Sequence, residues 1–503
     1  MDIPLAGAST HTAQTIAFAS LVVAAIALFP KLNLLFNLSK IPEFGTAKNG
    51  EKQRSFYLKY AIELYREGNK KFTDSIYRMA ASDEIKFVIV PAKFLPELKK
   101  LPDDVLDVRE AVSKALESKY LPHEAFDDIL THSAKADLTP ALGRLNGDIT
   151  EEIDLALDRA IPPCKDWTNV NIYNKLLEIV AQVSGRMFVG AEYCRDPTYL
   201  DLAVNFTNDF MGAVLAIKNC NPWLRRFKGP SLPAKQRFEE RLRRSKEFLR
   251  PIVLERLSGE KKCNDLLQWM MERSKSHGCG NDVEGHISRQ LTAAFAAVHT
   301  TSMVSTNILY SLAAAPEYLE PLREEIRTVK AAHGGKLDSR ALQDLVKLDS
   351  VMKEVMRMFP ANITGVGRYV RKPITLSNGQ YIPAGVIIEC PVDAIHFDQD
   401  TYSDADKFDG FRYYKLRQKG DTAEHARSQF VSSNERDLAF GYGKHACPGR
   451  FFAASEIKII LSRVLLEYDF KMPDGRTNRY DQIRHEKMLT PDTEKTLLMK
   501  RTV

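Results

Sequence analysis

Cys447 lies in a glycine-rich segment whose residue types suit the presentation of one thiolate to a metal ion. Residues 440–449 read FGYGKHACPG, and Gly441 and Gly443 permit backbone angles that other residues avoid. The chain can therefore curl until its N–H groups point at the sulfur. A helix is predicted from Arg450 to about Leu466, and its positive end would stabilise a thiolate. The pattern predicts a metal-ligating cysteine; the alternative is a buried structural cysteine beside a glycine turn.

The spacing Phe-x-x-Gly-x-x-x-Cys-x-Gly resembles the haem-binding signature of the cytochrome P450 superfamily, and every defined position of that signature is present. The resemblance implies that heme b is the cofactor and that Cys447 is the axial ligand of its iron. It also implies that Phe440, Gly441 and Gly449 belong to the haem-binding site. Gly449 leaves room for a flat macrocycle to approach the backbone. The implied fold is mainly α with a small β-rich subdomain.

Residues 349–359 (DSVMKEVMRMF) repeat apolar side chains at helical spacing. Glu354 and Arg357 lie three positions apart in this predicted helix and share a face. The pair resembles the Glu-x-x-Arg helix of the superfamily, and residues 408–412 (FDGFR) resemble its downstream arginine segment. The resemblance implies a buried Glu354–Arg357–Arg412 network that locks the fold around the haem and does no chemistry itself. The alternative is three surface charges.

A long helix is predicted from about Asp282 to Ala314, with four alanines among residues 293–297 at its middle. Small side chains let a helix lie close to a flat ligand. The segment resembles the distal helix of the superfamily, whose pattern is Ala/Gly-Gly-x-Asp/Glu-Thr-Thr. By this resemblance, Thr300 is the threonine that hydrogen-bonds dioxygen and its proton-delivering water. Thr301, the next residue, is a further catalytic candidate.

The chain departs from this pattern at His299, which replaces the family's acid. Because imidazole can shuttle a proton near neutral pH, His299 and Thr300 are predicted to form the proton-relay pair. The alternative is a helix histidine that bonds to a nearby backbone carbonyl. The Ala-Ala-x-His-Thr-Thr variant is similar to fungal cytochromes P450 of secondary metabolism, including those that act on diterpenoids.

Two further residues are candidates for the haem propionates. By its resemblance to the family, Arg368 is predicted to pair one propionate, because arginine favours bidentate carboxylate contacts. His445 stands where many relatives have a second propionate-binding Arg or Lys. The alternatives are an ordinary strand charge and a capping histidine. Residues 374–388, with Asn378-Gly379 between two apolar runs, predict a β-hairpin in a small sheet.

The substrate pocket is predicted, by position in the family, from segments that are apolar or small and therefore suit a bulky hydrophobic substrate. These segments are Leu121–Thr139, Phe206–Leu215, Ala293–Thr301, Ala361–Val366 and Leu489–Thr490. The basic, aromatic segment Trp223–Lys228 is a candidate for contact with a membrane surface. Lys444, Arg450 and Lys458 are candidates for docking an acidic redox partner. For both groups the alternative is a solvated surface.

The N-terminus predicts a membrane anchor. Residues 12–29 carry no charge and are mostly apolar, which is about the length that spans a bilayer. Lys31 and Lys40 follow the apolar run, so the bulk of the chain is expected on the cytosolic side. A cleaved signal peptide is the alternative, and the lack of positive charge before the run argues against it. We therefore expect an anchor in residues 1–30 and a monooxygenase domain in residues 31–503.

Composition excludes some classes. The chain has 503 residues, 44% of them hydrophobic, and a net charge of +6, which gives no reason to expect nucleic acid. No long Gly/Ser or Pro-rich linker, repeat or low-complexity run divides it. Seven dispersed cysteines fit reduced thiols better than a disulfide framework.

The family resemblance implies a haem-thiolate monooxygenase that inserts oxygen from O2 into a bulky hydrophobic secondary metabolite. A terpenoid or indole-terpenoid is the leading expectation. Electrons would come from NADPH-cytochrome P450 reductase, with cytochrome b5 as a further partner, at the endoplasmic reticulum membrane. Two alternatives are a haem-thiolate isomerase or lyase acting on a hydroperoxide, and a non-catalytic haem sensor. Retention of Thr300 and Thr301 argues against the first, and the lack of residues for an output domain argues against the second.

Overall fold

The computed structural model describes residues 6–47, 50–81, 87–259 and 262–502. The chain is mainly helical, with small sheets, as predicted. It divides into two compact units: residues 1–108 with 367–391, and residues 109–366 with 392–503. The predicted division at residue 30 stays a prediction.

The first unit is built on a six-stranded sheet in the order β1-β2-β3-β9-β6-β4. Strands β3 and β9 run parallel, with Val88 opposite Ile388. All three residues of β3 are apolar and buried. The six strands are β1 (Glu43–Phe44), β2 (Tyr77–Met79), β3 (Phe87–Ile89), β4 (Leu106–Asp107), β6 (Gly365–Val370) and β9 (Ile387–Cys390). The unit also holds helices α2 (Gln53–Lys71) and α3 (Leu95–Leu98), and the single-turn helix η1 (Ala92–Phe94).

The predicted hairpin is confirmed. Strands β7 (Ile374–Thr375) and β8 (Tyr381–Ile382) pair antiparallel, with Ile374 opposite Ile382. Gly379 has a φ of +82°, a left-handed conformation that glycine adopts without steric cost. The Asn-Gly pair therefore sits where the sequence pattern requires it.

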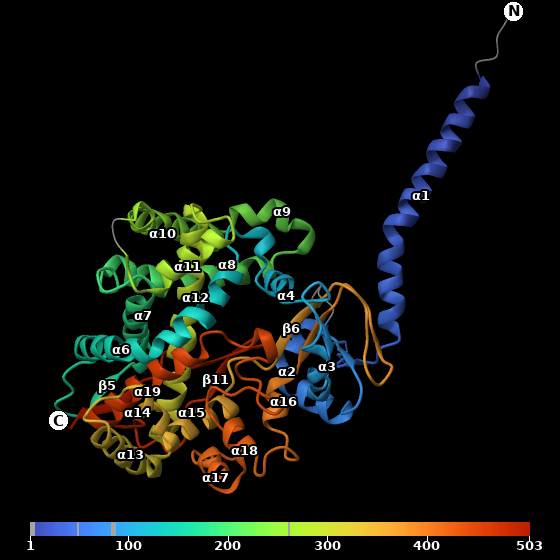
Figure 1. Ribbon diagram of the computed structural model, residues 1–503. Coiled ribbons are helices and arrows are strands. Elements are labelled where there is room, and N and C mark those ends of the chain that lie inside the picture. The colour runs from blue at the N-terminus through green and yellow to red at the C-terminus, as the bar shows by residue number, and fades with distance from the viewer. Residues whose placement is uncertain (1–5, 48–49, 82–86, 260–261, 503) are drawn as a thin grey trace, which may run out of the picture. The chain divides into compact units, whose positions relative to one another are not determined.

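The first unit begins with helix α1 (Ala6–Ser39), which extends beyond both ends of the predicted apolar run (Figure 1). The most apolar window within Gln14–Ser39 has a mean hydropathy of 2.0, and none of that window is buried. Among the described residues one other helix is long and apolar enough to cross a membrane, α8 (Pro197–Asn219), and 44% of its most apolar window is buried in the protein. The apolar helix α1 is thus a possible membrane anchor, whereas α8 packs as a core helix.

The second unit is a helical assembly around α12 (Val283–Ala314), which crosses it from end to end (Figure 1). Asp282 caps α12 by accepting a hydrogen bond from the N–H of Gly285, so the predicted start of this helix is confirmed. Most of α12 is buried, and it packs against α7, α8, α10, α15 and α19. A helix that is buried nearly all round organises the core rather than one face of it.

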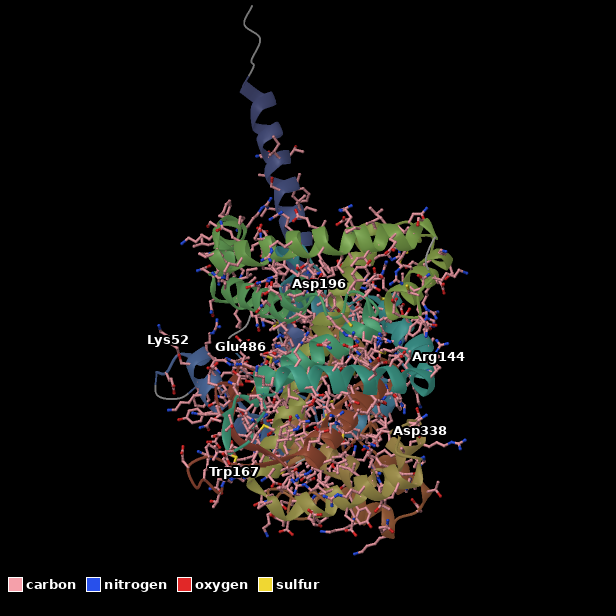
Figure 2. The ribbon with its side chains drawn as sticks, turned by 90° about the vertical axis from the view of Figure 1, so that its left-hand side faces the viewer. Lys52, Arg144, Trp167, Asp196, Asp338 and Glu486 are labelled. Carbon is pink, nitrogen blue, oxygen red and sulfur yellow. The ribbon has the colours of Figure 1, made fainter. Side chains whose placement is uncertain are left out.

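The longer helices of this unit are α4 (Val108–Ala115), α6 (Thr139–Ala160), α7 (Ile172–Phe188), α8, α10 (Pro233–Ser258), α11 (Leu266–Ser276), α12, α13 (Leu319–Ala332), α15 (Val346–Met358), α17 (Arg412–Lys419) and α19 (Arg450–Glu467). Short helices connect them: η2 (Ser118–Tyr120), α5 (Asp128–Ser133), η3 (Ala134–Leu138), η4 (Pro222–Leu224), α9 (Arg225–Lys228), η5 (Gly229–Ser231), η6 (Pro316–Tyr318), α14 (Ser339–Asp344), α16 (Val392–His396), α18 (Thr422–Arg427) and η7 (Gly443–His445). Asp196 and Asp338, labelled in Figure 2, cap α8 and α14 by accepting backbone N–H bonds.

Two small sheets complete the second unit. One has the order β10-β13-β5 and consists of β10 (Tyr468–Lys471), β13 (Leu497–Arg501) and β5 (Thr168–Val170). The other is a hairpin of β11 (Gln482–His485) and β12 (Met488–Pro491), which pair antiparallel. The turn of this hairpin contains Glu486 (Figure 2), which forms an ion pair with Lys218 of α8 at 3.5 Å. The hairpin that carries the predicted Leu489–Thr490 segment is thereby tied to α8.

Candidate haem-thiolate site

The Cys447 loop (residues 440–449) is a closed turn that ends at the start of a helix. The N–H of Cys447 donates to the carbonyl oxygen of Phe440 at 2.7 Å, which joins the two ends of the loop. Gly441 and Gly443 have φ of +76° and +68°, so both glycines adopt the left-handed conformation that the sequence predicted. Helix α19 begins directly after Gly449.

Several groups fix the position of this loop. The Phe440 ring meets Phe430 edge to face, with ring centroids 5.3 Å apart. Lys135 donates to the carbonyl oxygen of Lys444 at 2.6 Å, and Arg450 donates to the carbonyl oxygen of Cys447 at 2.7 Å. The loop is therefore held by side chains on both sides of the cysteine.

Burial raises the pKa of the Cys447 thiol. The N–H groups of Gly449 and Arg450 and the charges of Arg450 and Lys135 act in the opposite direction but do not outweigh the burial. A positively charged metal would supply the missing stabilisation, because coordination deprotonates a thiol. The protein groups around Cys447 thus favour its thiolate form, but not enough to offset the effect of burial.

One side of α12 is left uncovered in the middle of the core. Between His286 and Ala313, Ala296 and Thr300 are the exposed residues of this helix. They lie four positions apart and therefore share a face. The Thr300 hydroxyl donates to the carbonyl oxygen of Ala296 at 2.6 Å, which leaves its lone pairs free to accept a further hydrogen bond. A flat ligand and a water molecule both suit this face, since Ala296 offers only a methyl group and Thr300 adds a hydroxyl group and a second methyl group.

His299 points to a different side of α12. Its ring is buried, and its Nε2 lies 2.8 Å from the carbonyl oxygen of Val204 in α8. Because a carbonyl can only accept, Nε2 carries the proton, and Nδ1 accepts from the Tyr173 hydroxyl of α7 at 3.0 Å. Burial lowers the pKa of His299, so the ring is neutral near pH 7. Both ring nitrogens are engaged by protein groups, which is the arrangement that the alternative interpretation describes. Thr301, one residue on, is buried.

The structure brings Glu354, Arg357 and Arg412 together. Arg357 forms two hydrogen bonds of 2.8 Å with the Glu354 carboxylate, and both side chains are fully buried. The Nε of Arg412 donates to the same carboxylate at 3.1 Å. Arg357 also donates to the carbonyl oxygens of His396 and Ala405 at 2.7 Å. The three residues link α15, α16 and α17 in one buried network.

A second connection leads from this network to the Cys447 loop. His396 Nδ1 donates to the carbonyl oxygen of Arg357 at 3.1 Å, and its Nε2 accepts from the N–H of Leu438 at 3.4 Å. The neighbouring Asp437 forms a buried ion pair with Lys353 of α15. Asp437 and Leu438 lie three and two residues before Phe440, so α15 and α16 hold the segment that leads into the loop.

The sequence did not predict the roles of Lys353, His396 and Asp437. The prediction for a fourth residue, Lys458, was that it is a surface cation. Lys458, predicted as a docking cation, is buried, because its ammonium group pairs with Asp349 at 2.7 Å and donates to the carbonyl oxygen of Leu342 at 2.8 Å. That prediction was wrong: Lys458 ties α19 to α15. The sequence held one signal for this: Lys458 lies at a position of its helix that faces the core. A charged residue at such a position is almost always paired.

Arg368 belongs to the first unit and lies on β6. Among the described residues no carboxylate lies within ion-pair distance of its guanidinium, which donates to the carbonyl oxygen of Gly367 at 2.7 Å. Burial lowers its pKa to about 10. A half-buried cation without an acidic partner suits an anionic ligand group. His445 ends the short helix η7 and is half-buried.

This geometry agrees with comparisons with known proteins. Residues 138–499 match the cytochrome P450 family. The chain belongs to the cytochrome P450 family. It is 33% identical to cytochrome P450 monooxygenase TES1 of Alternaria alternata over 98% of this chain and 94% of that protein. It is 34% identical to cytochrome P450 monooxygenase braC of Annulohypoxylon truncatum over 99% of both chains. A third relative, cytochrome P450 monooxygenase AN1598 of Emericella nidulans, is 36% identical over 88% of this chain and 84% of its own length.

This cytochrome P450 is therefore a haem-thiolate monooxygenase, an oxidoreductase whose cofactor is haem. The residues present fit that group, because the uncovered Ala296–Thr300 face offers little bulk and the Cys447 loop offers a sulfur beside glycines. Cys447 would hold the iron, with Phe440, Gly441 and Gly449 beside the macrocycle. A thiolate-bound haem supplies the electron density that favours O–O cleavage.

Proposed function

We propose that this cytochrome P450 oxidises a bulky hydrophobic secondary metabolite, a terpenoid or indole-terpenoid, at the membrane of the endoplasmic reticulum. Electrons come from NADPH-cytochrome P450 reductase, and cytochrome b5 is a further donor. The observation that carries the oxygenase part is the uncovered Thr300 hydroxyl on a mostly buried helix. The orientation of the substrate against this face would decide whether the reaction is a hydroxylation, an epoxidation or several successive oxidations.

The predicted pocket segments support a large apolar substrate. Phe206 and Phe210 of α8 stack with ring centroids 6.3 Å apart, and the Phe210 ring meets Phe295 of α12 at 5.2 Å. His123 packs edge-on against both α8 rings, and burial lowers its pKa to about 4. Because Phe206, Phe210 and His123 are buried, these contacts fix α8 against α12 and do not themselves line a cavity. The proposal of an apolar substrate rests on the apolar and small residues of the predicted segments.

Thr300 is proposed to handle the proton. Its O–H points to the Ala296 carbonyl, and its lone pairs face the uncovered side of α12. A water that donates to Thr300 Oγ1 can pass a proton on when the hydroxyl rotates away from that carbonyl. His299 is proposed to position Thr300, because its hydrogen bonds to Tyr173 and Val204 fix the helix turn on which Thr300 lies.

Arg368 and His445 are proposed to bind the haem propionates, as the family pattern implies. The lack of an ion pair between Arg368 and any described residue supports this assignment for the arginine. The Glu354–Arg357–Arg412 network is proposed to act as scaffold, since its members are engaged with one another and with backbone carbonyls.

The membrane and the reductase complete the proposal. Helix α1 supports a single N-terminal anchor in residues 1–30, with the remaining residues forming the monooxygenase domain on the cytosolic side. Lys444 and Arg450 support docking of an acidic reductase, because they lie in or next to the Cys447 loop. Lys458 takes no part, since it is buried.

A spin-state titration tests the substrate class. The haem-loaded, membrane-reconstituted chain is titrated with terpenoids, indole alkaloids, polyketides and fatty acids, and the shift of ferric haem from low to high spin is recorded. A saturable shift with terpenoids, followed by NADPH-dependent turnover with reductase, is the expected result. A saturable shift with fatty acids alone would refute the terpenoid assignment. Turnover of hydroperoxides without reductase would instead indicate an isomerase or lyase.

A further inference from the structure

A cationic cavity opens beside the connection between α8 and α10. It has a volume of about 340 Å³. Its walls come from the turn η2 (Ser118–Tyr120), from α9 with η5, and from the first turns of α10. The lining residues are Lys119, Tyr120, Arg225, Arg226, Gly229, Pro230 and Lys235. Four of these seven residues are cations and none is acidic, so the cavity suits an anion.

Two of the four cations are already compensated. Arg225 pairs with Glu117 at 3.2 Å and donates to the carbonyl oxygens of Cys220 and Lys218 at 3.2 Å. Lys235 pairs with Glu239 at 3.2 Å. Lys119 and Arg226 form no ion pair with any described residue, so the cavity keeps two positive charges of its own.

Large exposed apolar side chains lie next in the chain to the residues that line the cavity. Trp223 is 88% exposed and Phe227 is 77% exposed. Both lie within the same short connection as Arg226, and Lys228 follows directly. Exposed tryptophan and phenylalanine next to lysine and arginine are typical of a segment that rests in the headgroup region of a bilayer.

We propose that this cavity, which we name the α9 cavity, binds the phosphate of an anionic phospholipid whose acyl chains lie against Trp223 and Phe227. Arginine and lysine are the side chains that bind phosphate most readily. The exposed rings of Trp223 and Phe227, adjacent in the chain to Arg225 and Arg226, favour a lipid over a soluble phosphate, because a soluble anion leaves both rings in water. The inference rests on the membrane association proposed above and adds to it a lipid class and a binding site.

Headgroup binding would also hold two segments of the second unit together. The ion pair between Arg225 and Glu117 already connects the α9 connection with the segment that precedes η2. Glu117 has a φ of +52°, so this segment makes a tight left-handed turn next to the cavity. A phosphate between Lys119 and Arg226 would add a second bridge across the same junction.

The test uses Trp223 as its own reporter. The full haem-loaded chain with W167F and W269F keeps Trp223 as its one tryptophan. It is reconstituted into phosphatidylcholine vesicles that contain equal fractions of brominated acyl chains, carried either by phosphatidylcholine or by phosphatidic acid. We expect Trp223 emission to be quenched more strongly by brominated phosphatidic acid. K119Q and R226Q should each lower this preference about fivefold, the factor that corresponds to about 1 kcal/mol per cation near a membrane.

The control variant K336Q/R340Q removes two exposed cations, one on the connection between α13 and α14 and one in the first turn of α14, and should leave the preference unchanged. Equal quenching by the two lipids would overturn the α9 cavity while leaving the membrane contact intact. Quenching by neither lipid would refute the membrane contact of this segment and the cavity's lipid together. Loss of the preference in inorganic phosphate, but not in chloride of the same ionic strength, would reassign the cavity to a soluble anion.

Discussion

Replacement of Asp437 by asparagine should weaken the hold of α15 on the Cys447 loop. Asp437 lies three residues before Phe440 and pairs with Lys353, whose side chain is 2% exposed. Burial alone would raise the pKa of Asp437, but Lys353 and His396 hold it below its usual value. D437N leaves the Lys353 ammonium buried without a carboxylate.

The structure sets the expected magnitude. Breaking a buried pair by removing one partner costs about 3–5 kcal/mol. Lys353 retains bonds to the Ser432 hydroxyl and carbonyl at 3.2 and 3.4 Å, which places the loss near the lower end of that range. A loss of about 3 kcal/mol raises the population of chains with a detached loop by about 100-fold.

The assay follows the thiolate-ligated carbon-monoxide band of the ferrous haem during urea unfolding. D437N should lose this band at a clearly lower urea concentration than the parent chain. The matched control is E320Q, which removes an exposed acid that pairs with Arg327 at 2.8 Å. Exposed pairs contribute little, so E320Q should follow the parent curve. Coincident curves for D437N and E320Q would refute the proposed link between α15 and the loop.

Three other perturbations probe the site and its supports. T300V should retain the haem but release reduced oxygen as peroxide, whereas T300S should stay coupled; equal coupling in the two variants, measured as product per NADPH, would place the proton path elsewhere. H299L should leave the Tyr173 hydroxyl and the Val204 carbonyl without a partner and destabilise the fold by about 1–3 kcal/mol in urea melts, with product per NADPH nearer to that of the parent than to that of T300V. Coupling as poor in H299L as in T300V would instead make His299 part of the relay. Burial opposes ionisation of Asp349, but Lys458 and Arg417 lower its pKa to about 2 from 3.8. Its ionised form therefore contributes about 2 kcal/mol to the free energy of unfolding above pH 4. This contribution should be lost as the pH falls through 2. D349N should flatten this part of the stability profile, and an unchanged profile would contradict the assignment.

The sequence predicted the parts of the fold that depend on local pattern. The long distal helix was predicted over about Asp282 to Ala314 with four alanines at its middle, and the structure has α12 over Val283–Ala314. The hairpin at Asn378-Gly379 was predicted because only a few residue pairs satisfy its turn. The family of the chain followed from the glycine and cysteine spacing of the loop itself.

The remaining features depend on contacts between distant segments. Nothing in the local sequence shows that His299 meets Val204 of another helix, because the direction of its ring is fixed by how α8 packs on α12. Likewise, the burial of Lys458 depends on the approach of Asp349 from α15. A helical pattern indicates which face is apolar, but it does not show which charge on that face has a partner.

The whole site depends on Cys447 ligating the haem iron as a thiolate. The most direct measurement is the carbon-monoxide difference spectrum of the reduced, haem-loaded chain, compared with C447S and with C220S as the control for loss of a half-buried thiol. The parent chain and C220S should show the red-shifted band of thiolate-ligated haem, and C447S should lack it. Persistence of that band in C447S would contradict the assignment of Cys447 and the site built on it.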